Sequence, residues 1–161
     1  MKKGLVALIV VGFVACFFAP SWAFDEQLAK NYEKFFADYK DDKVVSALGM
    51  VKPNELVDEI RANEDIRILD IRTTLETSIV GMTLKNTLNI PIDEVFKPEN
   101  LAKIPKDKKL VVVCQKGLRA AIVATALRNI GFNNVRIIQG GMLALVEYLS
   151  PDNLFKKAET K

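Results

Sequence analysis

Histidine is absent from this sequence of 161 residues. Its absence removes the most common protein ligand of zinc and copper sites and the commonest acid or base near neutral pH. It also removes the base that activates serine or cysteine in Ser-His and Cys-His pairs. Any enzymatic nucleophile in this chain must therefore be activated by other groups, and no metal site is expected.

An excess of charge of one sign is missing as well. The chain has 23 Lys and Arg against 20 Asp and Glu, which gives a net charge of +3, and its lysines are scattered among acidic residues. Nucleic-acid-binding proteins usually gather basic residues on one face, so this composition argues against a nucleic-acid partner. Because half of the residues are apolar, the chain can build the core of one globular domain.

Cysteine is scarce and occurs only as Cys16 and Cys114. Residues 1–23 carry two early lysines, an apolar run and the final residues Pro-Ser-Trp-Ala, a pattern typical of a secretory signal peptide cut after Ala23. We therefore expect a periplasmic or secreted protein. Cleavage would remove Cys16 and leave Cys114 as the only thiol of an exported protein, with no internal partner for a disulfide.

Two other interpretations of residues 1–23 remain open. The uncharged run from Gly4 to Phe24 is just long enough to span a bilayer, so an uncleaved segment would anchor the protein to the membrane. Lipidation at Cys16 is less favoured, because Phe13 does not fit the usual lipoprotein pattern. Contact with a membrane is expected only through this segment.

The rest of the chain divides into an N-terminal segment, a domain and a tail. Apolar residues recur at helical spacing from Phe24 to Tyr39, which predicts an amphipathic helix within residues 24–45. This helix packs either on its own domain or on a second subunit. Residues 46–150 form the predicted domain, and residues 151–161 form a charged, frayed tail.

Strands and helices alternate through the predicted domain. Short apolar, often β-branched runs predict strands, and segments of helical period bounded by proline or glycine predict helices. Strands are expected at residues 47–51, 66–71, 88–90, 110–113 and 135–138, and helices at 53–63, 98–103, 119–130 and 142–149. The alternation predicts an α/β fold, a three-layer sandwich whose mainly parallel central sheet is flanked by helices.

Cys114 directly follows the strand at 110–113, whose continuous apolar run is typical of a central strand buried on both faces. In open parallel sheets the binding crevice lies beyond the carboxyl ends of the strands. The lone thiol is therefore expected where this architecture places functional sites. An inert, buried cysteine that behaves as a small hydrophobe is the alternative.

The stretch CQKGLR, residues 114–119, must turn tightly between this strand and the next helix, and Gly117 permits the required backbone angles. A tight turn into a helix N-terminus directs several N–H groups at one point and attracts an anion. Together with Lys116 and Arg119, these groups would favour a thiolate at Cys114 or hold an anionic substrate.

Three motifs resemble the rhodanese family, in that family's order. Leu69-Asp70-Ile71-Arg72 with Glu76 resembles its DVR segment and following acid, Asn89-Ile90-Pro91 resembles its NIP signature, and CQKGLR precedes an apolar helix and Gly140-Gly141-Met142. The similarity covers residues 46–149 and implies a single-domain sulfurtransferase that carries sulfane sulfur as a cysteine persulfide. Such an enzyme takes sulfur from thiosulfate or a similar donor, passes it to cyanide or a thiol, and needs no cofactor.

The resemblance also assigns roles to individual residues. Cys114 would be the catalytic nucleophile, Lys116 would attract a dianionic donor, and Arg119 would brace the loop. Arg72 either reaches the same crevice or pairs with Glu76 or another surface acid. The resemblance implies substrate-binding residues Gln115, Lys116, Gly117, Leu118, Arg119 and Arg72, and structural roles for Asp70 and Glu76.

Two rival functions stay open, a non-catalytic rhodanese-like binding module and a phosphatase or arsenate reductase. The phosphatase relatives use a loop one residue longer than the stretch from Cys114 to Arg119, so the spacing favours sulfur chemistry. The chain departs from the family at Gly81-Met82-Thr83, where Gly-His-Ile is usual, and at Leu145, where Trp is common. Both departures lie outside the loop and concern the rim of the pocket.

Overall fold

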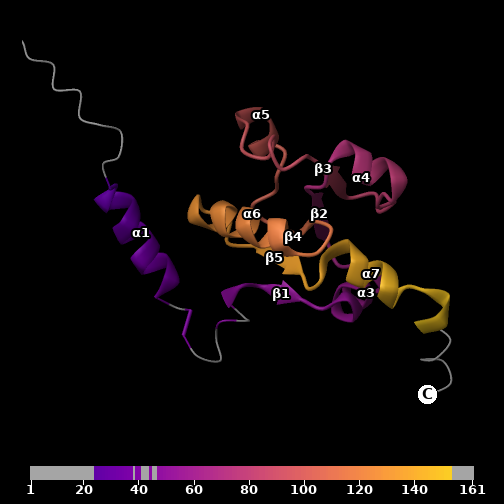
Figure 1. The fold of residues 1–161 in the computed structure, drawn as a ribbon. Helices are drawn as coiled ribbons and strands as arrows, with labels where there is room; N and C mark the ends of the chain where they lie inside the picture. Colours follow the sequence, from indigo (N-terminus) through magenta and orange to yellow (C-terminus); the bar gives the residue numbers. More distant parts are fainter. Residues whose placement is uncertain (1–23, 38, 41–43, 45–46, 154–161) are drawn as a thin grey trace, which may run out of the picture. The chain divides into compact units, whose positions relative to one another are not determined.

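The computed structural model describes residues 24–37, 39–40, 44 and 47–153 (Figure 1). The predicted signal peptide at 1–23 and the tail from 154 to 161 lie outside these residues, while residues 151–153 are helical. The chain forms two units, one up to Lys34 and one from Phe35 onward. Within the described ranges, no helix is long and apolar enough to cross a bilayer.

Helix α1 (Glu26–Phe36) is shorter at both ends than the predicted helix from Phe24 to Tyr39. Asp25 caps its first turn, because the carboxylate Oδ1 accepts a hydrogen bond from Leu28 N at 2.8 Å. After its last turn, the ring of Tyr39 lies against Phe35 and Phe36, with centroid separations of 5.6 and 5.1 Å. The helix therefore ends in an aromatic cluster.

Five parallel strands form the central sheet in the order β1-β5-β4-β2-β3 (Figure 1). They are β1 (Met50–Val51), β2 (Ile66–Asp70), β3 (Thr87–Asn89), β4 (Lys109–Val113) and β5 (Val135–Ile138). Strand β4 is the middle strand, and its residues Leu110 to Val113 are completely buried, as expected of a strand covered on both faces. The predicted α/β fold with a parallel sheet is confirmed.

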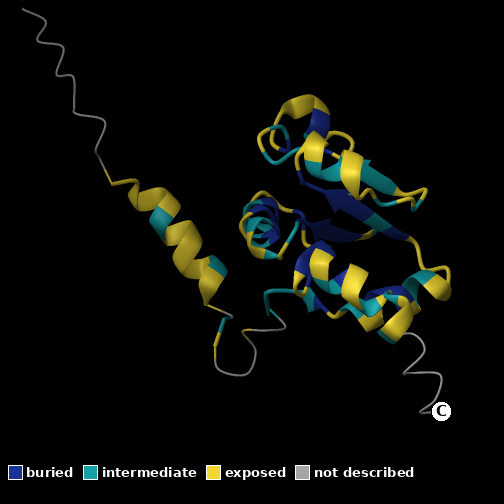
Figure 2. Cartoon of the chain, turned by 45° about the vertical axis from the view of Figure 1, so that its right-hand side comes forward, coloured by how far each residue is buried: buried dark blue, intermediate teal, exposed yellow. Residues whose placement is uncertain are grey.

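Helices cover both faces of this sheet. They are α3 (Pro53–Arg61), α4 (Thr74–Ile79), α5 (Pro98–Leu101), α6 (Leu118–Asn129) and α7 (Gly141–Tyr148). Successive strand side chains point to opposite faces, so Leu110 and Val112 pack in the core with α6, whereas Val111 and Val113 pack with α3 and α7. Figure 2 shows buried strands between helices with exposed outer sides, which confirms the three-layer sandwich.

Helix α4 has no counterpart among the predicted elements. It begins with a capping box in which Thr73 Oγ1 accepts a hydrogen bond from Glu76 N at 3.2 Å and Glu76 Oε2 accepts one from Thr73 N at 2.9 Å. The Thr-x-x-Glu spacing is the sequence signal that would have revealed this helix. Because α4 directly follows β2, it places Glu76 at the same edge of the sheet as Cys114.

Candidate active site at the end of strand β4

The loop from Cys114 to Gly117 connects the carboxyl end of β4 to α6. Gly117 has a φ of +94°, a left-handed conformation that side chains disfavour, and it forms the N-cap of α6. This turn directs the amides of Gly117 and Ala120 at the Cys114 sulfur, with N–S distances of 3.1 and 3.3 Å. Two amide donors at a helix N-terminus stabilise negative charge on the sulfur without an imidazole.

The thiol is recessed. Cys114 is a free cysteine, only 1% exposed, and its side chain borders the core between the sheet and α6. The sulfur itself faces the amides of Gly117 and Ala120, so it is not surrounded by hydrocarbon alone. A reactant can therefore reach the Cys114 sulfur only with a narrow terminal group.

A second glycine turn supports the loop from the side of α7. Gly140 and Gly141 have φ values of +74° and +65° and start this helix. Met142 N then donates to the carbonyl of Cys114 at 2.9 Å, and Leu143 N donates to that of Gln115 at 3.1 Å. These bonds give both carbonyls of the loop a donor and fix the direction in which the loop runs.

Arg119, in the first turn of α6, makes a bidentate ion pair with Glu76 of α4, with Nη1–Oε2 at 2.9 Å and Nη2–Oε1 at 2.6 Å. The hydrogen bond from Arg119 is the main reason that the pKa of Glu76 falls to about 2, and the bond from Thr73 N adds to it. Glu76 in turn raises the pKa of Arg119, with smaller contributions from Cys114. The guanidinium thus ties the loop to α4 and acts electrostatically on the thiol.

The other loop side chains differ in exposure. Gln115 is partly buried, while Lys116 and Leu118 are exposed. No ion pair or hydrogen bond engages the Lys116 ammonium within the part of the chain that the structure describes. Lys116 is therefore the side chain of this loop that can meet an anion arriving from solvent.

Arg72 lies away from solvent, contrary to the expectation that it binds substrate or pairs with Glu76 or a surface acid. Its side chain is 1% exposed and donates to both carboxylate oxygens of the buried Asp70, with Nη2–Oδ2 at 2.6 Å and Nε–Oδ1 at 2.9 Å. The turn after β2 folds Arg72 back onto Asp70, and Glu76 is taken by Arg119. Asp70 also anchors the turn by accepting a hydrogen bond from Arg72 N at 3.1 Å.

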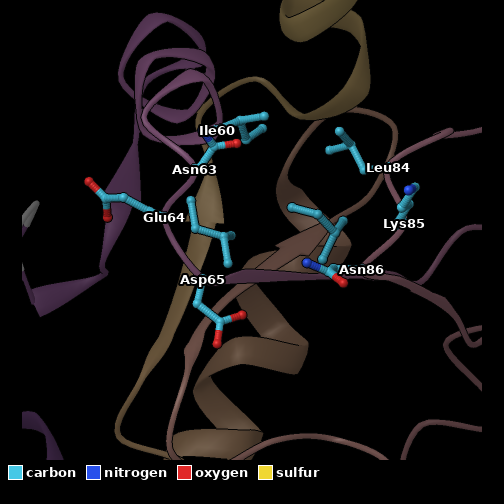
Figure 3. A pocket seen from close by; sticks show the side chains of 9 residues that line it. Ile60, Asn63, Glu64, Asp65, Leu84, Lys85 and Asn86 are labelled. Atoms are coloured by element: carbon cyan, nitrogen blue, oxygen red, sulfur yellow. The ribbon is translucent and has the colours of Figure 1, made fainter.

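A cavity of about 320 Å³ lies at the opposite edge of the sheet, where β2 begins (Figure 3). Its two acids already have partners, because Glu64 pairs with Lys109 and Asp65 pairs with Lys108. No group of three possible metal ligands gathers anywhere among the residues with described structure. The cavity is separate from Cys114 and offers no reactive group of its own.

A parallel α/β domain with a cysteine-bearing loop that runs into a helix N-terminus defines the class of this protein. The chain belongs to the rhodanese-like domain family, whose model matches residues 52–147. The predicted family is thereby confirmed.

Individual relatives and solved structures agree with this assignment. The chain is 31% identical over 123 residues to a probable adenylyltransferase/sulfurtransferase, MoeZ, of Mycobacterium tuberculosis; the match covers 76% of this chain but only 31% of that protein. It is also 31% identical over 98 residues to a putative sulfurtransferase, YtwF, of Bacillus subtilis, covering 61% of this chain and 90% of the relative. A rhodanese-related protein of Thermoplasma volcanium superposes with a TM-score of 0.53 at 26% identity, covering 63% of this chain and 94% of that one.

The Arg119–Glu76 pair predicts a pH-dependent contribution to stability. Since the pKa of Glu76 is about 2 when folded against an ordinary 4.5, this contribution is complete above pH 4.5 and declines as the pH falls toward 2. We expect Glu76→Gln to be less stable than the wild type at neutral pH, and the difference to shrink across that window. Urea unfolding at successive pH values measures it.

The matched control for this prediction is Leu101→Ala, which removes an apolar side chain packed against the core and no ionisable group. It should lower stability by an amount that does not shrink between pH 4.5 and 2, because neither the leucine nor the alanine binds a proton. A wild-type advantage over Glu76→Gln that stays constant through the whole window would contradict the electrostatic role of the pair.

Proposed function

We propose that this protein is a sulfurtransferase in which Cys114 carries sulfane sulfur as a persulfide. The observation that carries the proposal is the pair of amides, from Gly117 and Ala120, that donate to the Cys114 sulfur at 3.1 and 3.3 Å. Relatives named as sulfurtransferases support the same chemistry.

In the first half-reaction, the thiolate of Cys114 attacks the sulfane sulfur of thiosulfate or a similar donor. An S–S bond forms to Cys114, the S–S bond of the donor breaks, and sulfite leaves with the electron pair. In the second, cyanide or a thiolate attacks the outer sulfur, and the electron pair of the broken bond returns to Cys114. The amides of Gly117 and Ala120 stabilise negative charge at the sulfur in both steps, so neither step needs a histidine base.

Incubation with thiosulfate followed by intact-mass measurement tests the proposal. We expect the reduced full chain to gain the mass of one sulfur atom, to lose it on addition of cyanide, and to gain nothing as Cys114→Ser. The Cys16→Ser variant is the control, because it removes the other cysteine and should keep the gain. Turnover of an aryl phosphate without uptake of sulfur would contradict the proposal and identify the protein as a phosphatase. If neither reaction occurred, a non-catalytic binding module would be favoured.

Lys116 is expected to attract the dianionic donor, because its exposed ammonium lies in the loop that holds Cys114. Lys116→Gln should lower kcat/KM for thiosulfate about tenfold at low ionic strength, through loss of electrostatic attraction. The effect should fade as salt is added. Lys85→Gln, at the cavity on the opposite edge of the sheet, is the control and should leave kcat/KM unchanged. A salt-independent loss in Lys116→Gln would contradict the electrostatic explanation.

We further propose that the protein acts outside the cytoplasm, on the strength of the signal-like sequence of residues 1–23. Sequencing the N-terminus of protein recovered from each cell fraction tests this. A chain that begins at Phe24 in the periplasm or medium supports export, an intact chain in the membrane fraction supports an anchor, and an intact cytoplasmic chain contradicts both.

A further inference from the structure

Exposed leucines lie on the three helices that adjoin the Cys114 site. Leu75 of α4 is 72% exposed and directly precedes the glutamate that pairs with the loop arginine. Leu118 opens α6 and is 76% exposed. Leu143 of α7 is 46% exposed, and its amide binds the Gln115 carbonyl at 3.1 Å. We call Leu75, Leu118 and Leu143 the leucine rim.

None of the three leucines of the rim belongs to either hydrophobic core cluster. Ile79 and Ile122 extend the rim, because each lies one helical turn beyond a rim leucine and is also exposed. Single exposed apolar side chains are ordinary. Several of them around one reactive group form the kind of patch that marks an interaction site.

The charges beside the leucine rim indicate which residues a complementary partner would carry. Arg119 and Glu76 neutralise each other, whereas Lys116 has no ion-pair partner in the described part of the chain. A surface with apolar side chains and one available cation is complementary to a partner with apolar residues and one acidic group beside its reacting atom. Cyanide and other small acceptors contact only the sulfur and leave the leucines in water.

The burial of Cys114 indicates what shape a partner needs in order to reach the sulfur. The residue is 1% exposed, and the outer sulfur of its persulfide would lie only about 2 Å beyond Sγ, the length of an S–S bond. A cysteine on a protruding segment can reach the recessed sulfur while the residues beside that cysteine contact the leucine rim. A cysteine on a flat surface cannot reach the sulfur and contact the leucines at the same time.

We infer that the sulfur acceptor is a cysteine on a protruding segment of another protein, flanked by apolar residues and one acidic residue, and that the leucine rim is its docking surface. The inference rests on the proposed persulfide chemistry. The thiolate of the partner attacks the outer sulfur of the Cys114 persulfide, forms a new S–S bond and leaves with the sulfur as a persulfide. The old S–S bond breaks and its electron pair stays on Cys114, so no oxidant or reductant is consumed.

The test compares two synthetic cysteine peptides of equal length and charge, one with leucines and an aspartate around the thiol and one with serines and an aspartate. Full-length protein is loaded with thiosulfate, freed of excess donor and mixed with each peptide, and loss of sulfur is followed by rapid-quench mass spectrometry. We expect transfer to the leucine peptide to be about tenfold faster, because part of the leucine surface becomes buried.

The double variant Leu75→Ser/Leu143→Ser should lower the ratio of peptide to cyanide transfer about tenfold, by removing apolar surface from the rim. Ile130→Ser is the matched control, because Ile130 is 53% exposed and lies past the opposite end of α6. It should leave that ratio unchanged.

Equal rates for the two peptides, or an equal fall in cyanide and peptide transfer in the double variant, would overturn the inference and leave the proposed function intact. A dimer of the wild type that the double variant loses in sedimentation would assign the rim to a second copy and would also overturn it. Failure of the wild type to take up sulfur from thiosulfate would instead defeat the proposed function.

Discussion

Gly141→Ala should strongly reduce sulfur transfer and destabilise the domain. A Cβ at this position would lie 2.7 Å from Gly117 N and 2.8 Å from the carbonyl carbon of Gln115, and closer still to the Cys114 carbonyl oxygen. All three atoms belong to backbone, so no side-chain rotation can make room. The φ of +65° at Gly141 adds strain of about 1–2 kcal/mol for any residue with a side chain.

The clash can be relieved only by moving the loop away from α7, which would turn its amides away from the sulfur. We expect sulfur transfer in Gly141→Ala to fall at least about 100-fold, since displacements near 1 Å cost this much. The free energy of unfolding should fall by about 3 kcal/mol, from strain and overpacking together. Single-turnover transfer and urea unfolding measure the two effects.

Gly131→Ala is the matched control for this prediction. Gly131 also has a positive φ, +101°, but a Cβ there would meet no atom within 4 Å. This variant should show only the backbone strain of about 1–2 kcal/mol and transfer sulfur at the wild-type rate. A Gly141→Ala protein as active as Gly131→Ala would disprove the contact between the glycine turn and the loop.

Arg72→Met should lower the free energy of unfolding by about 3–5 kcal/mol, because it leaves the carboxylate of Asp70 buried without a counter-ion. Both side chains are essentially inaccessible to solvent, at 1% and 0% exposed. Chemical denaturation at neutral pH measures the loss. Restoring apolar contacts in Asp70→Leu/Arg72→Met should recover part of it, since the uncompensated charge is gone.

Arg67→Met, in strand β2 just before this turn, provides the comparison. Arg67 pairs with Asp65 at 3.1 Å, but its partner is 56% exposed, so the loss should stay below about 1 kcal/mol. If Arg72→Met were no more destabilising than Arg67→Met, the buried pair would not hold the turn after β2 in place.

The sequence predicted those parts of the fold that depend on local patterns. The apolar run before Cys114 identified the buried central strand, and the predicted limits of the strand at 135–138 agree with β5. The first strand was predicted too long, at 47–51, because Gly49 has a φ of +63° and keeps the chain in a turn until Met50. Helix α4 was missed because its signal lies in a capping box and not in apolar periodicity.

The site was predictable only where its residues are neighbours in the chain. The tight turn at Gly117 follows from the short connection between strand and helix, as does the direction of the Gly117 amide toward Cys114. The partner of Arg72 could not be predicted in this way, because two acids, Asp70 and Glu76, lie within four residues of it and only the folded turn decides between them. The support of the loop by Gly141 was equally hidden, because it joins segments far apart in sequence.

That last contact makes the geometry around the thiol depend on nearly the whole domain. The carbonyls of Cys114 and Gln115 gain their donors only when Met142 and Leu143, at the start of α7, fold against them. A chain that has folded only as far as α6 therefore lacks the support that holds the turn at Gly117 in place. The thiol site is completed among the last parts of the domain, in whichever compartment the chain folds.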